Sequence, residues 1–293
     1  MMFPLVCDLA AAGVPVAVTC RVLGFSKQAF YQWVANPVSE RDWQEATLLN
    51  AAYDIHADDP EFGHRFIADE LCAAGHRVSE RRVWRLCSQQ RIFSATICRA
   101  RRMNKKPGPA VCDDQVERDF TATAPNQLWL TDITEHQTAE GKLYACAVKD
   151  VFSNRIVGYS IGPRMKSHLA VAALNDAVAR RGAAHVVGCV VHSDRGSQLR
   201  SRRYQRAIKA HGLLGSMGRV GAAGDNAAME SFFSTLQKNV LNRRRWPSRD
   251  ELRREIIYWI ERTYHRRRRQ RRLGKLTPVE YETVYKTTVA LAA

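Results

Sequence analysis

The spacing of hydrophobic and polar positions changes near residue 124. Before this point apolar residues recur at helical spacing, and after it short apolar runs alternate with helical stretches. The runs QLWLTDIT, KLYACAVKD, NRIVGYSI, VVGCVVHSD and LLGSMG predict strands at 127–134, 142–150, 154–161, 186–194 and 213–218. Helices are predicted at 167–181, 201–211 and 227–240. This order predicts an α/β core, a mixed five-stranded sheet flanked by helices.

Residues 1–40 predict a small helix-turn-helix segment. Two helices flank a turn at Gly24, Ser26 is placed to cap the second helix, and the apolar spacing runs through Val18, Val22, Leu23 and Phe30. The second helix of such a unit can lie in a DNA major groove, with Lys27 and Gln28 at its start. A helical hairpin that only packs against the rest of the chain is the alternative.

Residues 41–105 predict a second helical, helix-turn-helix-like DNA-binding domain. Its middle helix closes at Gly75, and Ser79 caps a helix that places Arg81, Arg82 and Arg85 on neighbouring turns. We expect these arginines to contact DNA. The segment 106–122, which contains Pro-Gly-Pro, predicts a linker. The catalytic core with a basic C-terminal helical segment is then expected over 123–285, and a tail over 286–293.

Charge narrows the class of partner. The 293-residue chain has a formal net charge of +16 and a pI near 9.8, which favours a polyanion, with nucleic acid first. Residues 241–275 contain fourteen Lys or Arg against four acids, with aromatic residues between them. A solvated helix face is the alternative for this stretch. Backbone-contact candidates in the second half of the chain are Lys238, Arg243, Arg244, Arg245, Arg266, Arg267, Arg268 and Arg269.

The eight cysteines form no CxxC pair, so the spacing of a zinc site is missing. The N-terminal stretch has no basic region before its apolar residues and contains Asp8, which argues against a signal peptide. We therefore expect a cytoplasmic protein, associated with the nucleoid when it is bound to DNA.

Three acidic residues stand in strongly patterned segments. Asp132 and Asp194 are each expected at the end of a strand, and Glu230 near the start of a helix. Such carboxylates can converge on two Mg²⁺ or Mn²⁺ ions roughly 3.5–4 Å apart, which is how many enzymes cleave phosphodiesters. Among competing acids, Asp150 is expected to serve the turn after its strand, and Glu135 is expected to be solvated.

The helix that carries Glu230 is amphipathic. Met229, Phe233, Leu236 and Val240 share one face at about 100° per residue. Glu230 lies at the border of this face. Taken alone, a first-turn glutamate that suits the helix dipole is an adequate explanation.

Several segments together resemble a known family. LWLTDIT, FSNRIVGYSI, VVHSDRGSQ, GDNAAMESFFSTLQKN and ERTYHRRRRQRRLGKLTPVEY are similar to the second-frame (OrfB) transposase of the bacterial insertion sequence three family. The resemblance covers nearly the whole chain. It implies an RNase H-like integrase core and a DDE triad, which map by motif to Asp132, Asp194 and Glu230. Two departures are GAAGDN before the glutamate helix and TYHRRR near the end, where relatives often have cysteine-tryptophan and tyrosine-asparagine.

The resemblance also implies an activity and partners. Family members use Mg²⁺ to nick the element ends, and the freed 3′-hydroxyl then attacks target DNA. They act as oligomers on DNA, often as a frameshift fusion with an upstream OrfA that carries a leucine zipper, and no sustained heptad pattern is present here. A catalytically silent DNA-binding regulator or domesticated remnant is the alternative function. An RNA–DNA hybrid nuclease would share the core but leaves the N-terminal helices unexplained.

Overall fold

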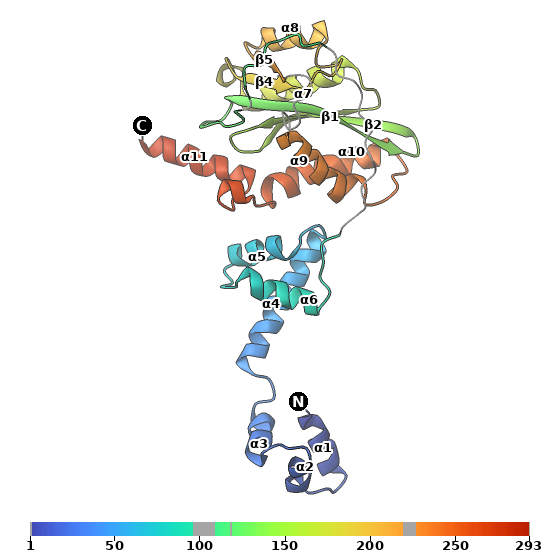
Figure 1. Cartoon of the computed structure of the whole chain (residues 1–293), viewed down its shortest axis with the longest axis vertical. Coiled ribbons are helices and arrows are strands. Elements are labelled where there is room, and N and C mark those ends of the chain that lie inside the picture. Colours follow the sequence, from blue (N-terminus) through green and yellow to red (C-terminus); the bar gives the residue numbers. More distant parts are fainter. Residues whose placement is uncertain (1, 96–108, 118, 219–226, 293) are drawn as a thin grey trace. The chain divides into compact units, whose positions relative to one another are not determined.

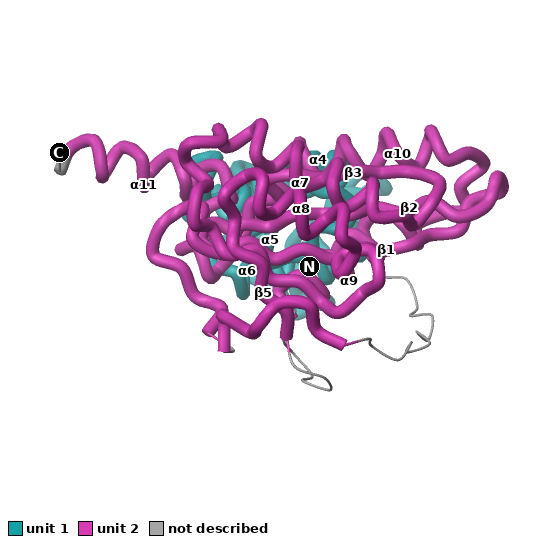
Figure 2. Tube along the Cα trace, turned by 90° about the horizontal axis from the view of Figure 1, so that it is seen from above, with its two compact units in different colours: residues 1–94 teal, residues 95–293 magenta. Residues whose placement is uncertain are grey.

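The computed structural model describes residues 2–95, 109–117, 119–218 and 227–292. The chain divides into two compact units, Met1–Ser94 and Ala95–Ala293 (Figure 2). The first unit is entirely helical over its described residues, and the second contains the sheet. The finer domain boundaries expected from the sequence stay predictions.

The first three helices form a small bundle. They are α1 (Phe3–Ala11), α2 (Val16–Val22) and α3 (Lys27–Ala35). Ser26 Oγ accepts a hydrogen bond from the Ala29 amide at 3.0 Å, which confirms the predicted cap. The apolar spacing was a poorer guide, because Val18 and Val22 are 40% and 76% exposed. The predicted position Phe30 is in the bundle core with Phe3, Val6 and Cys20, and Leu23 packs against this core.

The next three helices form a second bundle in the same unit. They are α4 (Glu40–Asp58), α5 (His64–Ala73) and α6 (Glu80–Gln89). The chain turns after α5 at Gly75, whose φ of +93° favours glycine. Ser79 Oγ then accepts from the Arg82 amide at 3.3 Å and begins α6, as predicted. The buried side chains are Ala52, Phe62, Ile67, Ala68, Leu71, Val83, Cys87 and Ile92.

The second unit is built on a five-stranded mixed sheet with the order β3-β2-β1-β4-β5 (Figure 1). The strands are β1 (Leu128–Thr138), β2 (Gly141–Asp150), β3 (Ile156–Gly162), β4 (Val190–Ser193) and β5 (Leu214–Met217). β1, β2 and β3 are antiparallel neighbours, whereas β1, β4 and β5 run parallel. The predicted α/β core, a mixed five-stranded sheet flanked by helices, is confirmed.

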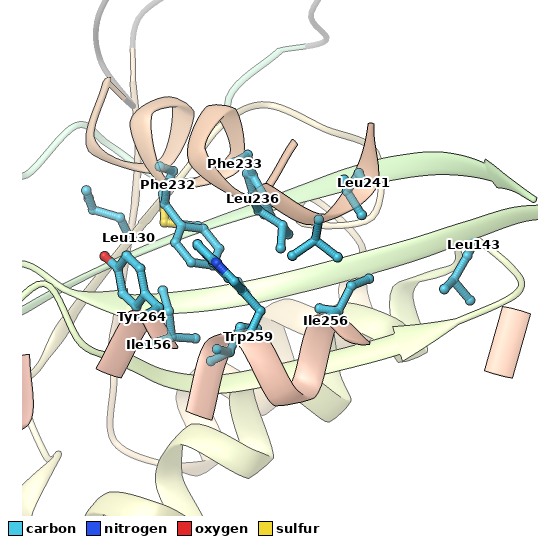
Figure 3. Close-up of a cluster of buried hydrophobic side chains, with 14 of the residues drawn as sticks. Leu130, Leu143, Ile156, Phe232, Phe233, Leu236, Leu241, Ile256, Trp259 and Tyr264 are labelled. Carbon is cyan, nitrogen blue, oxygen red and sulfur yellow. The ribbon is translucent and has the colours of Figure 1, made fainter. Parts of the chain in front are cut away.

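Helices cover both faces of this sheet. On one face lie α7 (Ser167–Arg181) and α8 (Arg202–Ala210), which bury side chains such as Leu174, Tyr204 and Ile208. On the other lie α9 (Ala227–Leu236) and α10 (Arg249–Tyr258), whose cluster with β1 and β2 is drawn in Figure 3. The two helical layers place both faces of the sheet in hydrophobic cores.

The remaining elements extend or connect these layers. α9 continues into a π-helical turn at Gln237–Leu241, and α10 into one at Trp259–Tyr264. Short 3-10 turns occur at Ala183–His185 and Arg271–Leu273. The last helix, α11 (Pro278–Ala292), is tied to the core through Glu282, which forms salt bridges with Arg155 at 2.7 Å and with Arg181.

Part of the predicted linker packs on the core. Val116 is buried in the cluster shared with α9 and α10. The Gln115 amide donates to Ser216 Oγ at 3.0 Å, and Cys112 Sγ donates to Gln205 Oε1 at 3.1 Å. The described residues 109–117 therefore belong structurally to the second unit.

Candidate functional site

Asp132 and Asp194 lie on neighbouring parallel strands. The pairing of β1 with β4 runs from Leu128 opposite Val190 to Thr131 opposite Ser193. Asp132 is the next residue of β1, and Asp194 is the residue that follows β4. Adjacent strands are about 4.8 Å apart, so the two backbones are close at this point. The strand was predicted to end at Asp194, and β4 ends one residue earlier, at Ser193, so Asp194 lies at the carboxyl end of this strand as expected.

The predicted position of Asp132 at the end of its strand is wrong. Asp132 is the fifth of eleven residues in β1, and it pairs with Ala147 of β2. β1 continues to Thr138 because β2 supplies hydrogen-bonding partners beyond the short β4. The parallel pairing alone ends at Thr131, and this is enough to place Asp132 beside Asp194.

Besides burial, the negative charges of Asp132 and Asp194 both raise the pKa of one buried thiol, that of Cys146. Burial raises the pKa of Cys146 to about 12; a hydrogen bond from Thr131 opposes the shift, and the charges of Asp132 and Asp194 add to it. Cys146 is fully buried on the α7 side of the sheet. Its electrostatics therefore agree with the register in placing the two aspartates near each other.

The Asp194 carboxylate is fixed by the loop that follows it. Asp194 Oδ1 accepts a hydrogen bond from the Gly196 amide at 3.0 Å. A Cβ atom at Gly196 would lie 2.9 Å from this oxygen, so glycine allows the close approach. Arg195 Nε donates to the Gly218 carbonyl at 2.7 Å and holds the loop against the residues after β5.

Glu230 is presented by a well-anchored helix. Met229, Phe232, Phe233 and Leu236 are buried against the sheet, which confirms the predicted face and adds Phe232 to it. Glu230 itself is exposed in the first turn of α9. The helix thus packs on β1 and leaves the carboxylate accessible.

A buried lysine joins the start of α9 to the sheet. Lys149 Nζ donates to the Ala228 carbonyl at 3.1 Å. Lys149 lies on β2 opposite Leu130, two residues from the pair of Ala147 with Asp132. This contact holds the first turn of α9 near the strand that carries Asp132. The sequence offered no signal for it, because a lysine in a strand is usually exposed.

The donor chemistry of the site suits a hard divalent cation. Asp132, Asp194 and Glu230 offer carboxylate oxygens only, which Mg²⁺ and Mn²⁺ prefer. Within the described part of the chain, no group of three or more His, Cys, Asp or Glu side chains is close enough to hold a metal ion. The structure brings Asp132 and Asp194 together, and the convergence of Glu230 with them stays a prediction.

The competing acids have structural partners. Asp150 is completely buried, accepts from the amides of Asn126 and Phe152 at 3.0 Å each, and pairs with Arg181 at 3.0 Å. Burial raises the pKa of Asp150, and these contacts oppose the shift. Glu135 pairs with Lys142 at 2.9 Å. Asp150 therefore serves the turn after β2, as predicted.

Known families match both units. The integrase core domain matches residues 122–223 and again 211–278, and an HTH-like domain matches residues 42–102. A 31 kDa protein of insertion element IS600 from Shigella sonnei is 36% identical over 91% of this chain and 98% of its own length. The chain belongs to the IS3 family of insertion-sequence transposases.

Two further similarities extend the comparison. The transposase InsF for insertion sequence IS3A from Escherichia coli is 34% identical over 90% of this chain and 92% of that protein. Among solved structures, the magnesium-bound HTLV-2 integrase catalytic core is 14% identical over 55% of this chain and 99% of its own length, with a TM-score of 0.42. Within the described residues of this transposase, no helix has the length and apolar character needed to cross a membrane.

The first unit of the transposase exposes only some of its candidate DNA contacts. Lys27, Gln28 and Arg81 are exposed at the starts of α3 and α6. Arg82 and Arg85 instead turn toward Glu45 of α4, Arg82 at 3.8 Å and Arg85 through a hydrogen bond that holds the pKa of Glu45 below its ordinary value. These two arginines connect α6 to α4, and their expected contact with DNA stays a prediction.

The outer face of α6 contains an aromatic residue that sequence reasoning missed. Trp84 is 54% exposed, one turn after Arg81, while Val83, Leu86 and Cys87 face the bundle core. Single exposed aromatic side chains are normal on protein surfaces, and Trp43, Tyr53 and Phe93 of the same unit are exposed as well. The signal for Trp84 was present in the sequence, because the inward positions at 83, 86 and 87 place residue 84 on the outside.

In the basic C-terminal segment, too, some candidate DNA contacts are exposed and others are paired or partly buried within the protein. Lys238, Arg243, Arg245 and Arg266 are exposed. Arg244 pairs with Glu251 at 2.6 Å and lies 4.4 Å from the Trp246 ring centroid, and Arg269 pairs with Glu280 at 2.9 Å. Arg267 and Arg268 are partly buried. Arg244 and Arg269 would therefore have to give up contacts within the protein to bind DNA.

The net charge is distributed unevenly between the two units. Residues 1–94 contain nine Lys or Arg against eleven Asp or Glu, whereas residues 95–293 contain 36 against 18. The long-range attraction for a polyanion therefore comes from the second unit. The exposed cations of α8, which sequence reasoning also missed, are part of this surplus.

Proposed function

We propose that this protein is a DDE transposase in which Asp132, Asp194 and Glu230 hold two Mg²⁺ or Mn²⁺ ions. It cleaves DNA strands at the ends of its element and transfers the freed 3′-hydroxyl to target DNA. The observation that carries the proposal is the pair of aspartates at the end of the parallel β1–β4 pairing. The packing of α9 on β1, in a chain of the IS3 transposase family, supports the third ligand.

The protein contributes rigidity and placement to this chemistry. Asp132 and Asp194 are placed by neighbouring strands, and the Gly196 amide orients one oxygen of Asp194. The buried face of α9 and the Lys149 contact position the turn that carries Glu230. When bound, two metal ions would activate the attacking oxygen and stabilise the leaving oxygen. The HTLV-2 integrase core and the Mos1 transposase catalytic domain were both solved with magnesium.

DNA would be held by both units. We assign reading of the element ends to the exposed starts of α3 and α6, with Lys27, Gln28, Arg81 and the neighbouring Trp84. The segment from Arg243 to Arg272 would bind phosphates. A homo-oligomer on DNA and an OrfA partner or fusion are further expectations, since an intasome is among the solved structures with a similar core.

The test is a comparison of nicking and DNA binding in Mg²⁺. Asp132→Asn, Asp194→Asn and Glu230→Gln should each lower nicking of supercoiled DNA by at least about a hundredfold, on the scale of a lost electrostatic catalytic group, while binding persists. Glu135→Gln is the matched control, because Glu135 is an exposed acid on the same strand as Asp132. Full nicking by Asp194→Asn would remove that residue from the mechanism. DNA binding by a wild-type protein that never nicks would favour the silent regulator.

A further inference from the structure

Helix α8 carries a face of four exposed cations, Arg202, Arg203, Arg206 and Lys209, here named the α8 basic face. Ser201 caps the helix by accepting from the Tyr204 amide at 3.2 Å. Tyr204 and Ile208 are 1% and 3% exposed and fix the opposite side of the helix to the core. The cations therefore point away from the sheet on a rigid element.

The cations of the α8 basic face have no salt-bridge partner among the described residues. Helix α8 itself contains no acid. Lys209 and Asp113 both act on the Cys112 thiol: burial raises the pKa of Cys112, the charge of Lys209 opposes this shift, and the charge of Asp113 adds to it. The face is therefore a concentrated positive surface.

This arrangement opposes helix stability. Arg202 and Arg206 are like charges at i,i+4, which destabilises a helix by about 0.2–0.5 kcal/mol per pair. Arg202 and Arg203 also occupy the first turn, where the helix dipole disfavours cations. Both effects lower the stability of α8. Binding of an anionic partner to the α8 basic face would offset them and would explain why the cations are there.

Hydrogen bonds fix the position of α8 relative to Asp194 and the loop that joins them, residues 195–201. α8 begins shortly after Asp194. Gln205 Nε2 donates to the Leu199 carbonyl at 2.8 Å, and Gln198 Nε2 donates to the Met165 carbonyl at 3.3 Å, so side-chain hydrogen bonds anchor the middle of the connecting loop. DNA bound to α8 would thus be positioned relative to Asp194.

The face lies on the opposite side of the sheet from α9 and α10 (Figure 1). The basic C-terminal segment, residues 241–275, contains α10, which packs in the same cluster as α9. The core therefore offers two separate cationic surfaces, and a strand-transfer enzyme must hold two duplexes, the element end and the target.

We propose that the α8 basic face binds the phosphate backbone of target DNA, an inference that rests on the proposed strand-transfer function. From Arg202 to Lys209 the helix rises about 10 Å, which matches about three base-pair steps of a duplex. The one polar uncharged side chain in the middle of α8, Gln205, is occupied by Leu199 and Cys112. A surface of cations alone positions DNA without reading its sequence, as a target site requires.

The first experiment measures affinity against salt for the full-length chain and a random-sequence 40-base-pair duplex, without divalent metal. The variant Arg202→Gln/Arg203→Gln/Arg206→Gln/Lys209→Gln should lower the log–log salt slope by about 2 or more, at about 0.9 per lost phosphate contact. The control Arg202→Lys/Arg203→Lys/Arg206→Lys keeps the charge and should keep the slope. An unchanged slope in a glutamine variant that unfolds at the wild-type temperature would overturn the proposal.

The second experiment separates target from element end. The duplex is the terminal inverted repeat that flanks the gene, either intact for binding or pre-nicked for strand transfer into a plasmid. The glutamine variant should bind the intact end within about twofold of wild type and lose about tenfold or more in strand transfer, since several phosphate contacts are removed. Equal losses in end binding and transfer would overturn the assignment to target. If wild type transfers no strands, the proposed function fails, and the metal-free salt slope still decides whether α8 binds DNA.

Discussion

Lys149 provides a direct test of how α9 is held. Its side chain is 5% exposed, and its ammonium donates to the Ala228 carbonyl at 3.1 Å. Burial, and secondarily the charge of Arg272, lowers the pKa of Lys149 to about 7. Replacement by Met keeps a similar length and apolar stem but removes both the charge and the hydrogen bond.

Two opposing energies decide the outcome. A pKa shift from 10.5 to about 7 corresponds to about 5 kcal/mol of lost stability where the lysine is charged in both states. A hydrogen bond from a charged donor contributes about 1.5–3 kcal/mol. Burial outweighs the hydrogen bond, so Lys149→Met should raise the free energy of unfolding at pH 6.5 by about 2 kcal/mol, in the range found for replaced buried charges.

The pH dependence has a definite sign. Between pH 7 and 10.5 the unfolded chain keeps the proton of Lys149 while the folded chain loses it. Since the unfolded state then binds more protons, wild-type stability rises with pH across this window. Relative to Lys149→Met, wild type should gain about 3 kcal/mol between pH 6.5 and 9.5.

The assay is urea unfolding of the full chain at both pH values, followed by tryptophan fluorescence. Lys142→Met is the matched control, because Lys142 is an exposed lysine on the same strand whose pKa is raised by its hydrogen bond to Glu135. The difference in the free energy of unfolding between wild type and Lys142→Met should be the same at pH 6.5 and at pH 9.5. A pH-independent difference between wild type and Lys149→Met would refute the reasoning, and a less stable Met variant at pH 6.5 would show that the hydrogen bond dominates.

Three further outcomes are expected. Gly158→Ala should lower the free energy of unfolding by about 3 kcal/mol in a denaturation assay, since its Cβ would lie 2.4 Å from the Ala177 nitrogen; a stable variant would contradict this. His265 accepts from the Ile156 amide at 3.1 Å and burial lowers its pKa, so wild-type stability should fall as the pH drops below 6.5, and less so in His265→Asn; parallel acid unfolding curves would speak against it. Changing Arg266–Arg269 to Ala should lower the salt slope for random DNA by about 0.9 per lost contact, and a loss confined to the cognate end would show that this segment reads sequence.

Periodicity predicted the elements around the site because it reports burial directly. The short apolar runs of β1 and β2 reflect burial on both faces of the sheet, and the helical stripe through Met229 and Leu236 reflects one face packed in a core. These patterns depend on residues close in the chain. The predicted strands, the order of elements and the inward face of α9 were therefore accessible from the sequence.

Features set by distant partners were not accessible. The length of β1 beyond Asp132 depends on β2 outlasting β4 as a partner. The orientation of Arg85 depends on Glu45, forty residues away in sequence. The Lys149 contact joins β2 to a helix that follows much later. Each requires knowledge of which segments meet, which spacing along one segment does not contain.

The division of charge between the units has a consequence for how this transposase distinguishes its two DNA substrates. The first unit has more acids than bases, so its attraction to phosphates at a distance is weak, and its binding must depend on close contacts by exposed residues such as Arg81 and Trp84. Close contacts to base edges carry sequence information, whereas cations that contact only phosphates bind any duplex. Recognition of the element end and affinity for DNA in general are thereby assigned to different parts of the chain. Increasing salt should accordingly weaken binding of random DNA more than the preference for the element end, because counterion release scales with the phosphates that the second unit neutralises.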